Sequence, residues 1–168
     1  EAVPVARHDV NPQRINIVHH GGAFRVRRLE DMIDVIARAE PRFHLNFMLT
    51  GSDTAYIAEL KDLSRKKAPG RVFFHDPVPP SGVVEAISRF DVSLVLKKPL
   101  CFNEKYCLPN KFFDSIVAGL AVVSGPSPEM ASIIREYGAG RVADSFSLND
   151  VATAINSLSA EDIRSMRI

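Results

Sequence analysis

The chain has 168 residues, enough for a single domain with a sizeable hydrophobic core. Hydrophobic residues make up 46% and charged residues 24%, and the formal net charge is +1, which excludes a general electrostatic attraction to nucleic acid or anionic membranes. The longest apolar runs, such as residues 92–96, are far shorter than the ~20 residues that span a bilayer, which excludes a transmembrane helix. Any anion-binding site must therefore be local.

The first 14 residues predict a linker ahead of one domain at residues 15–168. The linker segment is rich in proline and polar residues and has no apolar core of the kind found in signal peptides. The two cysteines, Cys101 and Cys107, have no second Cys or His pair at zinc-like spacing, so we expect reduced thiols and a cytoplasmic protein. A chain that opens on a linker is expected to be the second half of something longer.

Short apolar or β-branched runs alternate with amphipathic segments along the chain. Strands are expected at residues 15–19, 44–49, 71–75, 92–96, 121–124 and 141–143. Apolar residues at helical spacing predict helices within 29–36, 56–63, 83–90, 112–117, 130–137 and 148–158. Continuous apolar strands joined by crossover helices are typical of parallel sheets that are covered on both faces. The pattern therefore predicts an α/β fold, a doubly wound, mainly parallel sheet of about six strands in a Rossmann-like arrangement.

Ligands bind such sheets outside the carboxyl ends of the strands, which directs attention to the loops there. The first loop places Gly21, Gly22, Arg25 and Arg27 ahead of a helix. Adjacent glycines let a backbone approach a ligand, and guanidinium groups at a helix start attract anions such as phosphate. The same residues also suit a flexible turn followed by solvated arginines, so both interpretations stay open. The G-x-G-x-x-G fingerprint of dinucleotide sites is absent.

Three further features lie at the expected ligand face. His19 and His20 end the first strand, where histidines more often pack or form hydrogen bonds than catalyse. Ser52 or Asp53 is expected to cap the second helix. Prolines within residues 77–80 stiffen the loop after the third strand, and such a loop either presents backbone groups to a flat base or makes a simple rigid connection.

The segment after the fourth strand holds the richest polar chemistry. Pro109 fits the first turn of a helix, and Asn110 and Asp114 share one face of that helix. Asp114 therefore faces the mouth of the sheet or the solvent. The helix dipole favours a carboxylate near the helix start with or without a ligand, so a surface role and a binding role are equally open. The opposite face is expected to pack on the sheet through Phe112, Phe113, Ile116 and Val117.

These segments, in this order, resemble a known family. The block PNKFFDSIVAGLAVVSGPSPEMASIIREYGAGRVAD follows GGAFRVRRLEDMIDVIARA, FMLTG and RVFFHDPVPPSGVVEAISRFDVSLVL. Together they resemble the C-terminal, donor-binding domain of retaining family-four glycosyltransferases of the GT-B fold, and most of all a bacterial subgroup with a Pro-Asn-Lys-Phe/Leu-Phe-Asp/Glu signature. The resemblance covers nearly the whole chain, from residue 14 to residue 167.

The resemblance implies contacts with a nucleoside diphosphate sugar. Gly21, Gly22 and Arg27 would hold the diphosphate, with Arg25 as an alternative to Arg27. Backbone groups of Val78 and of the proline before it would contact the base. Of these residues, Arg27 is the one expected to act directly on the departing diphosphate.

The helix start is implied to bind the rest of the donor. Asp114 corresponds to the second of two family carboxylates, which binds the ribose hydroxyls, while the position of the first, which binds the donor sugar, is Tyr106. Either Glu104 reaches the sugar in its place, as a catalytic residue, or the subgroup does without that carboxylate. A phosphate is expected at the helix start, on the backbone N–H groups of Leu108, Asn110 and Lys111, with help from the Lys111 side chain.

The implied reaction transfers a sugar to an acceptor with retention, in bacterial polysaccharide or glycolipid synthesis. Arginines and a helix start can stabilise the departing diphosphate without a metal, and no metal-ligand cluster appears in the sequence, so we expect no metal and no cofactor besides the donor substrate. A sugar or lipid-linked acceptor would bind a separate N-terminal domain. We therefore expect this domain to bind donor without turnover, and the longer protein to associate with the inner face of the membrane peripherally, if at all.

Two rival interpretations remain. A GT-B-related sugar-nucleotide epimerase would need further acids and a histidine from another domain. A flavodoxin-like binding module would use the arginine loop to dock a protein partner. Binding of nucleoside diphosphates separates the second rival from the donor-domain hypothesis.

Overall fold

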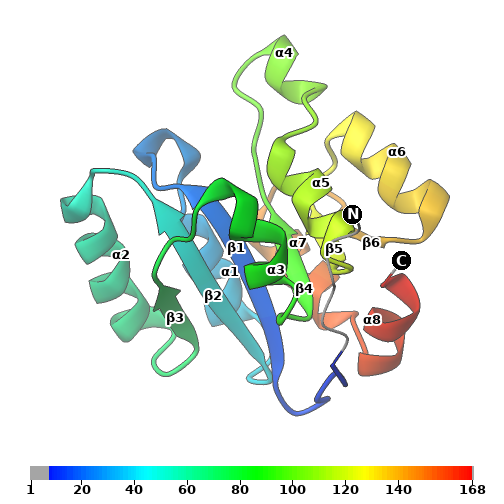
Figure 1. Cartoon of the computed structure of the whole chain (residues 1–168), viewed down its shortest axis with the longest axis horizontal. Helices are drawn as coiled ribbons and strands as arrows, with labels where there is room; N and C mark the ends of the chain where they lie inside the picture. Colours follow the sequence, from blue (N-terminus) through cyan, green and yellow to red (C-terminus); the bar gives the residue numbers. More distant parts are fainter. Residues whose placement is uncertain (1–7, 168) are drawn as a thin grey trace.

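The computed structural model, which describes residues 8–167, contains one open sheet of six parallel strands (Figure 1). The order of the strands in the sheet is β3-β2-β1-β4-β5-β6. The chain thus builds outward from β1 to β3, returns to place β4 beside β1, and builds outward again on the other side. The strands are β1 (Ile15–Gly22), β2 (Phe43–Thr50), β3 (Val72–His75), β4 (Val92–Val95), β5 (Ala121–Ser124) and β6 (Gly140–Val142). The doubly wound parallel sheet predicted from the sequence is confirmed.

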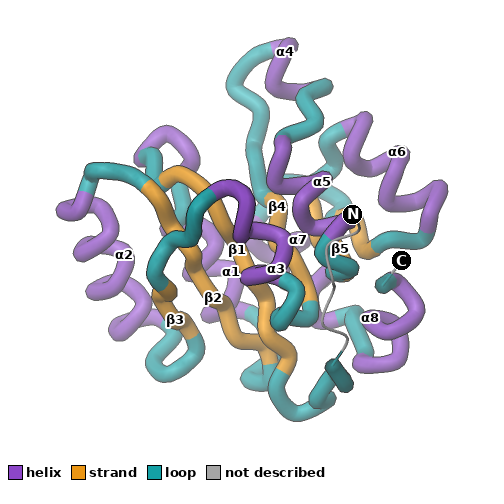
Figure 2. The backbone as a smooth tube through the Cα atoms, viewed as in Figure 1, coloured by secondary structure: helices purple, strands orange, loops and turns teal. Residues whose placement is uncertain are grey.

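Helices cover both faces of this sheet (Figure 2). On one face of the sheet, the face behind which Figure 1 draws α1 and α7, one large hydrophobic core joins the strands to α1 (Glu30–Arg38), α2 (Thr54–Lys67), α7 (Leu148–Asn156) and α8 (Ala160–Met166). In front, two smaller clusters involve α3 (Val83–Ile87), α5 (Asn110–Val117) and α6 (Pro128–Tyr137). The short elements are the 3-10 turns η1 (Arg25–Arg27) and η2 (Pro80–Gly82) and the helix α4 (Phe102–Lys105), which projects above the carboxyl edge of the sheet.

Three details of the fold correct or refine the sequence predictions. Gly21 and Gly22 are the last residues of β1 and pair with Leu49 and Thr50 of β2, so they belong to the strand and not to the loop after it. Helices α4 and α8 and the two 3-10 turns were not expected. Of the residues at the start of the chain, 1–7 of the expected linker lie outside the described residues, and 8–14 form no helix or strand.

The face that α5 presents to the sheet is narrower than predicted. Phe112 is fully buried against the strands, but Phe113 is 47% exposed and Val117 is 55% exposed. Adjacent helical residues point about 100° apart, so Phe112 and Phe113 cannot both face the sheet. At the start of α2, Asp53 is the N-cap and accepts a hydrogen bond from Tyr56 N at 2.8 Å, as one of the two expected candidates.

Within residues 8–167, every helix is too short or too polar to cross a lipid bilayer.

Candidate functional site

A cavity of about 460 Å³ opens at the carboxyl edge of the sheet, between β1 and β4. The connections leave these two neighbouring strands in opposite directions, and such a switch point creates the crevice in which doubly wound sheets bind ligands. The walls come from the end of β1, from η1, from the segment after β4 and from the first turns of α5. The lining residues are His19, His20, Gly21, Arg27, Leu29, Val95, Leu96, Lys97, Cys107, Leu108, Pro109, Asn110, Lys111 and Asp114.

Cationic side chains dominate the polar lining of this cavity. Arg27, Lys97 and Lys111 reach it from three separate segments, while Asp114 is the one carboxylate among its described lining residues. Lys111 is half-buried and makes no salt bridge with any residue that the structure describes, although its Nζ lies 3.3 Å from His19 Nε2. Burial of the amine, together with the charges of Arg27 and Lys97, lowers the pKa of Lys111 to about 7, against the opposing charge of Asp114. The cavity is therefore built to receive an anion.

Gly21 leaves space for the side chain of Lys111 because it has no side chain of its own. Its φ angle is 119°, in the region that favours glycine, and a Cβ added there would lie 3.1 Å from Lys111 Nζ. The ammonium group therefore lies over a stretch of bare backbone at the end of β1. A side chain at this position would have to displace it.

Two histidines from the end of β1 support the polar lining. His19 Nδ1 donates a hydrogen bond to Leu94 O at 2.9 Å, and burial holds the pKa of His19 well below its usual value, with Lys111 as the next cause. His20 is buried as well, and its Nε2 has no hydrogen-bond partner in the described part of the chain. The nearest carboxylate oxygen, Asp114 Oδ2, lies 4.0 Å from His20 Nε2. Burial also lowers the pKa of His20, and Asp114 opposes that change.

The first turn of α5 lines the same cavity through Asn110 and Lys111. Pro109 precedes the helix in an extended conformation, and no side chain of the described residues caps the helix start. The first N–H groups of a helix have no acceptor within it, so those of Asn110 and Lys111 are available to a ligand. The helix dipole adds positive potential at this point.

The structure brings together six of the residues that the sequence singled out. These residues, which line the one cavity, are Gly21, Arg27, Leu108, Asn110, Lys111 and Asp114. Four others lie elsewhere, namely Gly22, Arg25, Val78 and Glu104.

Each of the four has a local contact that explains its position. The Arg25 guanidinium is bound by Glu59 through two hydrogen bonds, of 2.7 and 2.9 Å, and by Asp53 at 3.0 Å. Val78 packs against the hydrophobic cluster beneath α3. The space beside Gly22 is filled by the ring of Phe24, which a Cβ would approach to 2.2 Å.

Glu104 lies in a second, adjacent cavity of about 250 Å³, which shares Arg27, Leu96 and Lys97 with the first. Its carboxylate lies 3.3 Å from Lys97 Nζ and accepts a hydrogen bond from Leu100 N at 2.8 Å. Tyr106 follows α4 and is 41% exposed, and its ring packs on Phe102 with centroids 4.9 Å apart, outside both cavities.

His19, His20 and Lys97 line the cavity although the sequence patterns did not predict them as site residues. His19 and His20 lie near the carboxyl end of β1, and Lys97 lies just after β4, the two strands that flank the switch point. The predicted strands already placed these residues near strand ends, but the sequence did not predict that β1 pairs with β4. Across residues 8–167, no three His, Cys, Asp or Glu side chains converge as metal ligands would.

Several solved structures share this fold at low sequence identity. WaaG, a glycosyltransferase involved in lipopolysaccharide biosynthesis, matches with a TM-score of 0.66 and 15% identity over 94% of this chain and 43% of its own. HepE of Anabaena, in complex with UDP and glucose, matches with a TM-score of 0.70 and 13% identity over 92% of this chain and 43% of its own. TarM of S. aureus, in a complex that includes UDP, matches with a TM-score of 0.73 and 13% identity over 99% of this chain and 32% of its own. The chain thus spans less than half of each of these proteins.

A search of curated proteins by sequence finds no match. The family model of the glycosyl transferases group 1 matches residues 14–161, nearly the whole of the described fold. This match confirms the family resemblance seen in the sequence, and the solved structures confirm the Rossmann-like half of a GT-B fold. The chain belongs to the glycosyl transferases group 1 family.

Proposed function

We propose that this chain is the donor-binding half of a glycosyltransferase that takes a sugar from a nucleoside diphosphate sugar and transfers it with retention. The observation that carries the proposal is the convergence of Arg27, Lys97, Lys111 and the start of α5 on one cavity at the switch point. A diphosphate is the ligand that uses all of these donors, because its oxygens accept both charge-assisted and backbone hydrogen bonds.

The two adjacent cavities suggest how the donor lies. The diphosphate would occupy the shared boundary at Arg27 and Lys97, and the ribose would extend into the first cavity toward Asp114. The sugar would then point into the second cavity, where Glu104 lies. In this arrangement Glu104 is the acid near the sugar, and Tyr106 has no role in donor binding.

The departing diphosphate determines the chemistry that the residues must supply. Negative charge grows on its oxygens as the bond to the anomeric carbon breaks, and preorganised cations and N–H groups stabilise that charge. We propose that Arg27, Lys111 and the start of α5 do this without a metal or other cofactor. A nucleotide containing uracil is supported by the UDP-glucose complex of HepE.

Transfer also needs an acceptor, which we propose to be a sugar or lipid-linked sugar in a bacterial polysaccharide or glycolipid pathway. The acceptor would bind a second domain, in keeping with the greater length of WaaG, HepE and TarM. Peripheral association with the cytoplasmic face of the membrane would follow from a lipid-linked acceptor. An epimerase would bind the same donor, but the family match favours transfer.

Calorimetric titration of the chain with UDP, GDP and ADP tests donor binding. We expect one of them to bind, and Arg27→Ala to weaken its binding by about tenfold to a hundredfold, the usual effect of losing a hydrogen bond to a charged group. Arg25→Ala is the matched control, because its guanidinium is held by Asp53 and Glu59 outside the cavity. The proposal is wrong if none of the three nucleotides binds, and the placement of the diphosphate is wrong if Arg25→Ala weakens binding as much as Arg27→Ala.

A further inference from the structure

A backbone carbonyl fixes the tautomer of His19 and, through it, the position of Lys111. The His19 ring is 3% exposed, its Nδ1–H donates to Leu94 O at 2.9 Å, and its edge packs against the ring of Phe47. With the proton on Nδ1, Nε2 carries a lone pair. That lone pair faces Lys111 Nζ at 3.3 Å, so the histidine acts as a neutral acceptor for the amine.

The groups around the Lys111 amine come from four elements. Arg27 from η1 and Lys97 from the segment after β4 are cations, and burial lowers the pKa values of His19 and His20 from β1. On α5 itself, Asp114 is the acid among the described groups that act on the amine, and its side chain is 36% exposed. Without a ligand, the amine therefore has a neutral partner and no close counter-ion.

We propose that His19 and Lys111 form a proton-coupled anchor for the diphosphate of the donor, in which donor binding draws one proton onto Lys111. His19 is a positioning residue that holds Nζ over Gly21, and Lys111 is the group that touches the phosphate. The amine takes the proton from solvent and becomes an ammonium, which donates one N–H to His19 Nε2 and the others to phosphate oxygens. This inference rests on the proposed function, because the ligand is the donor of that reaction.

The size of the effect follows from linkage. If the pKa of Lys111 is about 7 in the free chain and the amine stays fully protonated beside a bound diphosphate, binding takes up about 0.1 proton at pH 6 and about 0.9 proton at pH 8. The same arithmetic makes binding about tenfold weaker at pH 8 than at pH 6.

Calorimetry in pairs of buffers with different ionisation enthalpies measures this proton directly. The probes are UDP-glucose, GDP-mannose and ADP-glucose, whose phosphates are esterified on both sides and do not titrate near neutral pH, unlike those of free UDP. Lys111→Arg keeps a permanent charge and should bind without proton uptake and with the same affinity at pH 6 and pH 8. If a sugar nucleotide binds the unmodified chain at pH 8 without proton uptake, the anchor is disproved and the proposed function stands.

A matched pair of variants tests the part played by His19. His19→Gln places an amide oxygen near the position of Nε2 and keeps an acceptor for Lys111, whereas His19→Asn keeps the donor to Leu94 O and loses that acceptor. At pH 6 we expect His19→Gln to bind within about threefold of the unmodified chain and His19→Asn to bind about tenfold more weakly. Equal losses in both, or no loss in either, would show that His19 does not position Lys111. If none of the three sugar nucleotides binds at either pH, the proposed function fails and the anchor fails with it.

Discussion

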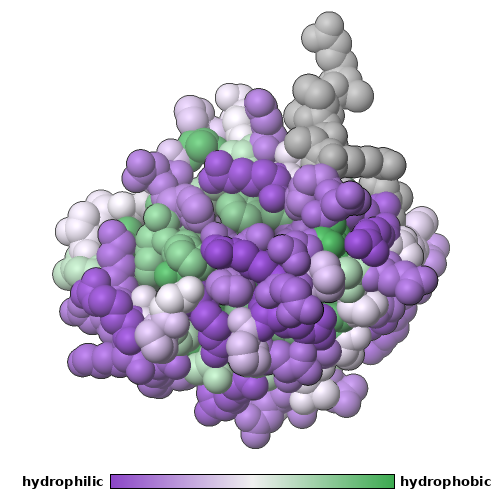
Figure 3. All heavy atoms as spheres, turned by 90° about the horizontal axis from the view of Figure 1, so that it is seen from below, coloured by the Kyte–Doolittle hydropathy of each residue, from purple (hydrophilic) through white to green (hydrophobic). Residues whose placement is uncertain are grey.

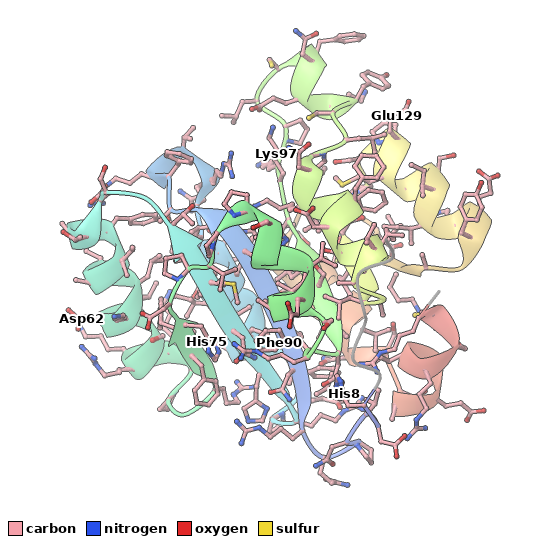
Figure 4. All side chains as sticks on the ribbon, in the orientation of Figure 1. His8, Asp62, His75, Phe90, Lys97 and Glu129 are labelled. Atoms are coloured by element: carbon pink, nitrogen blue, oxygen red, sulfur yellow. The ribbon has the colours of Figure 1, made fainter. Side chains whose placement is uncertain are left out.

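Asp91 and Lys111 are charged residues at opposite ends of the sheet, and they differ in how completely their charges are paired. Asp91, directly before β4, is 2% exposed and accepts three hydrogen bonds, from Asn16 N at 2.8 Å, His8 Nε2 at 2.9 Å and an Arg167 nitrogen at 2.9 Å. Figure 4 shows His8 at that lower end of the sheet, and Lys97 above the opposite, carboxyl edge. Asp91 thus joins the segment before β1 to the end of the chain after α8.

Lys111 has no such set of partners. Its nearest polar contact in the described structure is a neutral histidine, and two further cations, Arg27 and Lys97, face the same cavity. A charge with complete partners supports the fold, whereas a charge without them destabilises the free protein. Residues of the second kind are expected where a ligand supplies the missing partner.

The surfaces at the two ends differ in the same way. Figure 3 views the molecule from the side on which β1 begins, and hydrophilic side chains predominate there. At the carboxyl edge, large hydrophobic side chains line the second cavity, with Phe24 53%, Val26 68% and Leu100 69% exposed, and Phe102 on α4 is 76% exposed. The amino edge therefore has the hydrophilic side chains of an ordinary protein surface, whereas the carboxyl edge keeps exposed apolar side chains, as binding surfaces do.

Replacing the fully paired charge should have the largest effect on stability. Asp91→Asn keeps the size of the side chain but leaves the half-buried Arg167 guanidinium without its counter-ion, so we expect a loss of about 3 kcal/mol in the free energy of unfolding, measured with urea at pH 7. Glu40→Gln, which breaks an exposed ion pair with Arg42, should cost less than about 1 kcal/mol. Similar costs for the two variants would remove the distinction between Asp91 and an ordinary surface charge.

Removing the unpaired charge should stabilise the free chain. The pKa of Lys111 is about 7 in the folded chain, against an ordinary value of 10.5, so between these pH values the unfolded chain binds more protons than the folded chain. The stability of the unmodified chain therefore rises with pH across this window, and the half-buried ammonium destabilises it most below pH 7. We expect Lys111→Met to raise the free energy of unfolding by about 2 kcal/mol at pH 6, with a smaller gain near pH 10.

The control for this prediction is an exposed lysine. Lys66 lies on the outer surface of α2, so Lys66→Met should change stability by less than about 0.5 kcal/mol at either pH. A loss of stability in Lys111→Met at pH 6 would show that the amine is better solvated or better paired than the comparison with Asp91 requires.

The sequence predicted the fold well because each strand and helix has its own hydrophobic period. It placed Asp114 and Lys111 at the site because a helix start after a parallel strand lies at the carboxyl edge of the sheet. It did not foresee that Arg25 would be bound by Asp53 and Glu59, because those partners lie on another element, 28 and 34 residues further along the chain. Long-range pairs of this kind depend on strand order, which periodicity does not encode.

The acid expected near the donor sugar illustrates the same limit. Tyr106 was found by counting residues, but the short helix α4 changes the path of the chain before it and turns the tyrosine onto Phe102. Glu104 is directed to Lys97 by that helix. The connection between β4 and α5 contains this short helix, which counting along the sequence did not predict. Counting therefore does not locate the side chains in the connection.

The smallest effect is expected from replacing Asp114, whose carboxylate lies near His20 in the lining of the first cavity. Asp114 Oδ2 lies 4.0 Å from His20 Nε2 and raises the pKa of that histidine, against the larger effect of burial. Asp114→Asn should therefore lower the pKa of His20 further, as an NMR titration of its ring proton would show, while the pKa of His44, set by its own burial on β2, stays unchanged. Because Asp114 is partly exposed and makes no close contact of the kind that Asp91 has, stability should change by less than about 0.5 kcal/mol. An unchanged pKa at His20 would mean that solvent screens the charge of Asp114 completely. Asp114 would then have no electrostatic effect on the buried His20, and the lack of acidic partners at the cavity would contrast even more with the fully paired Asp91.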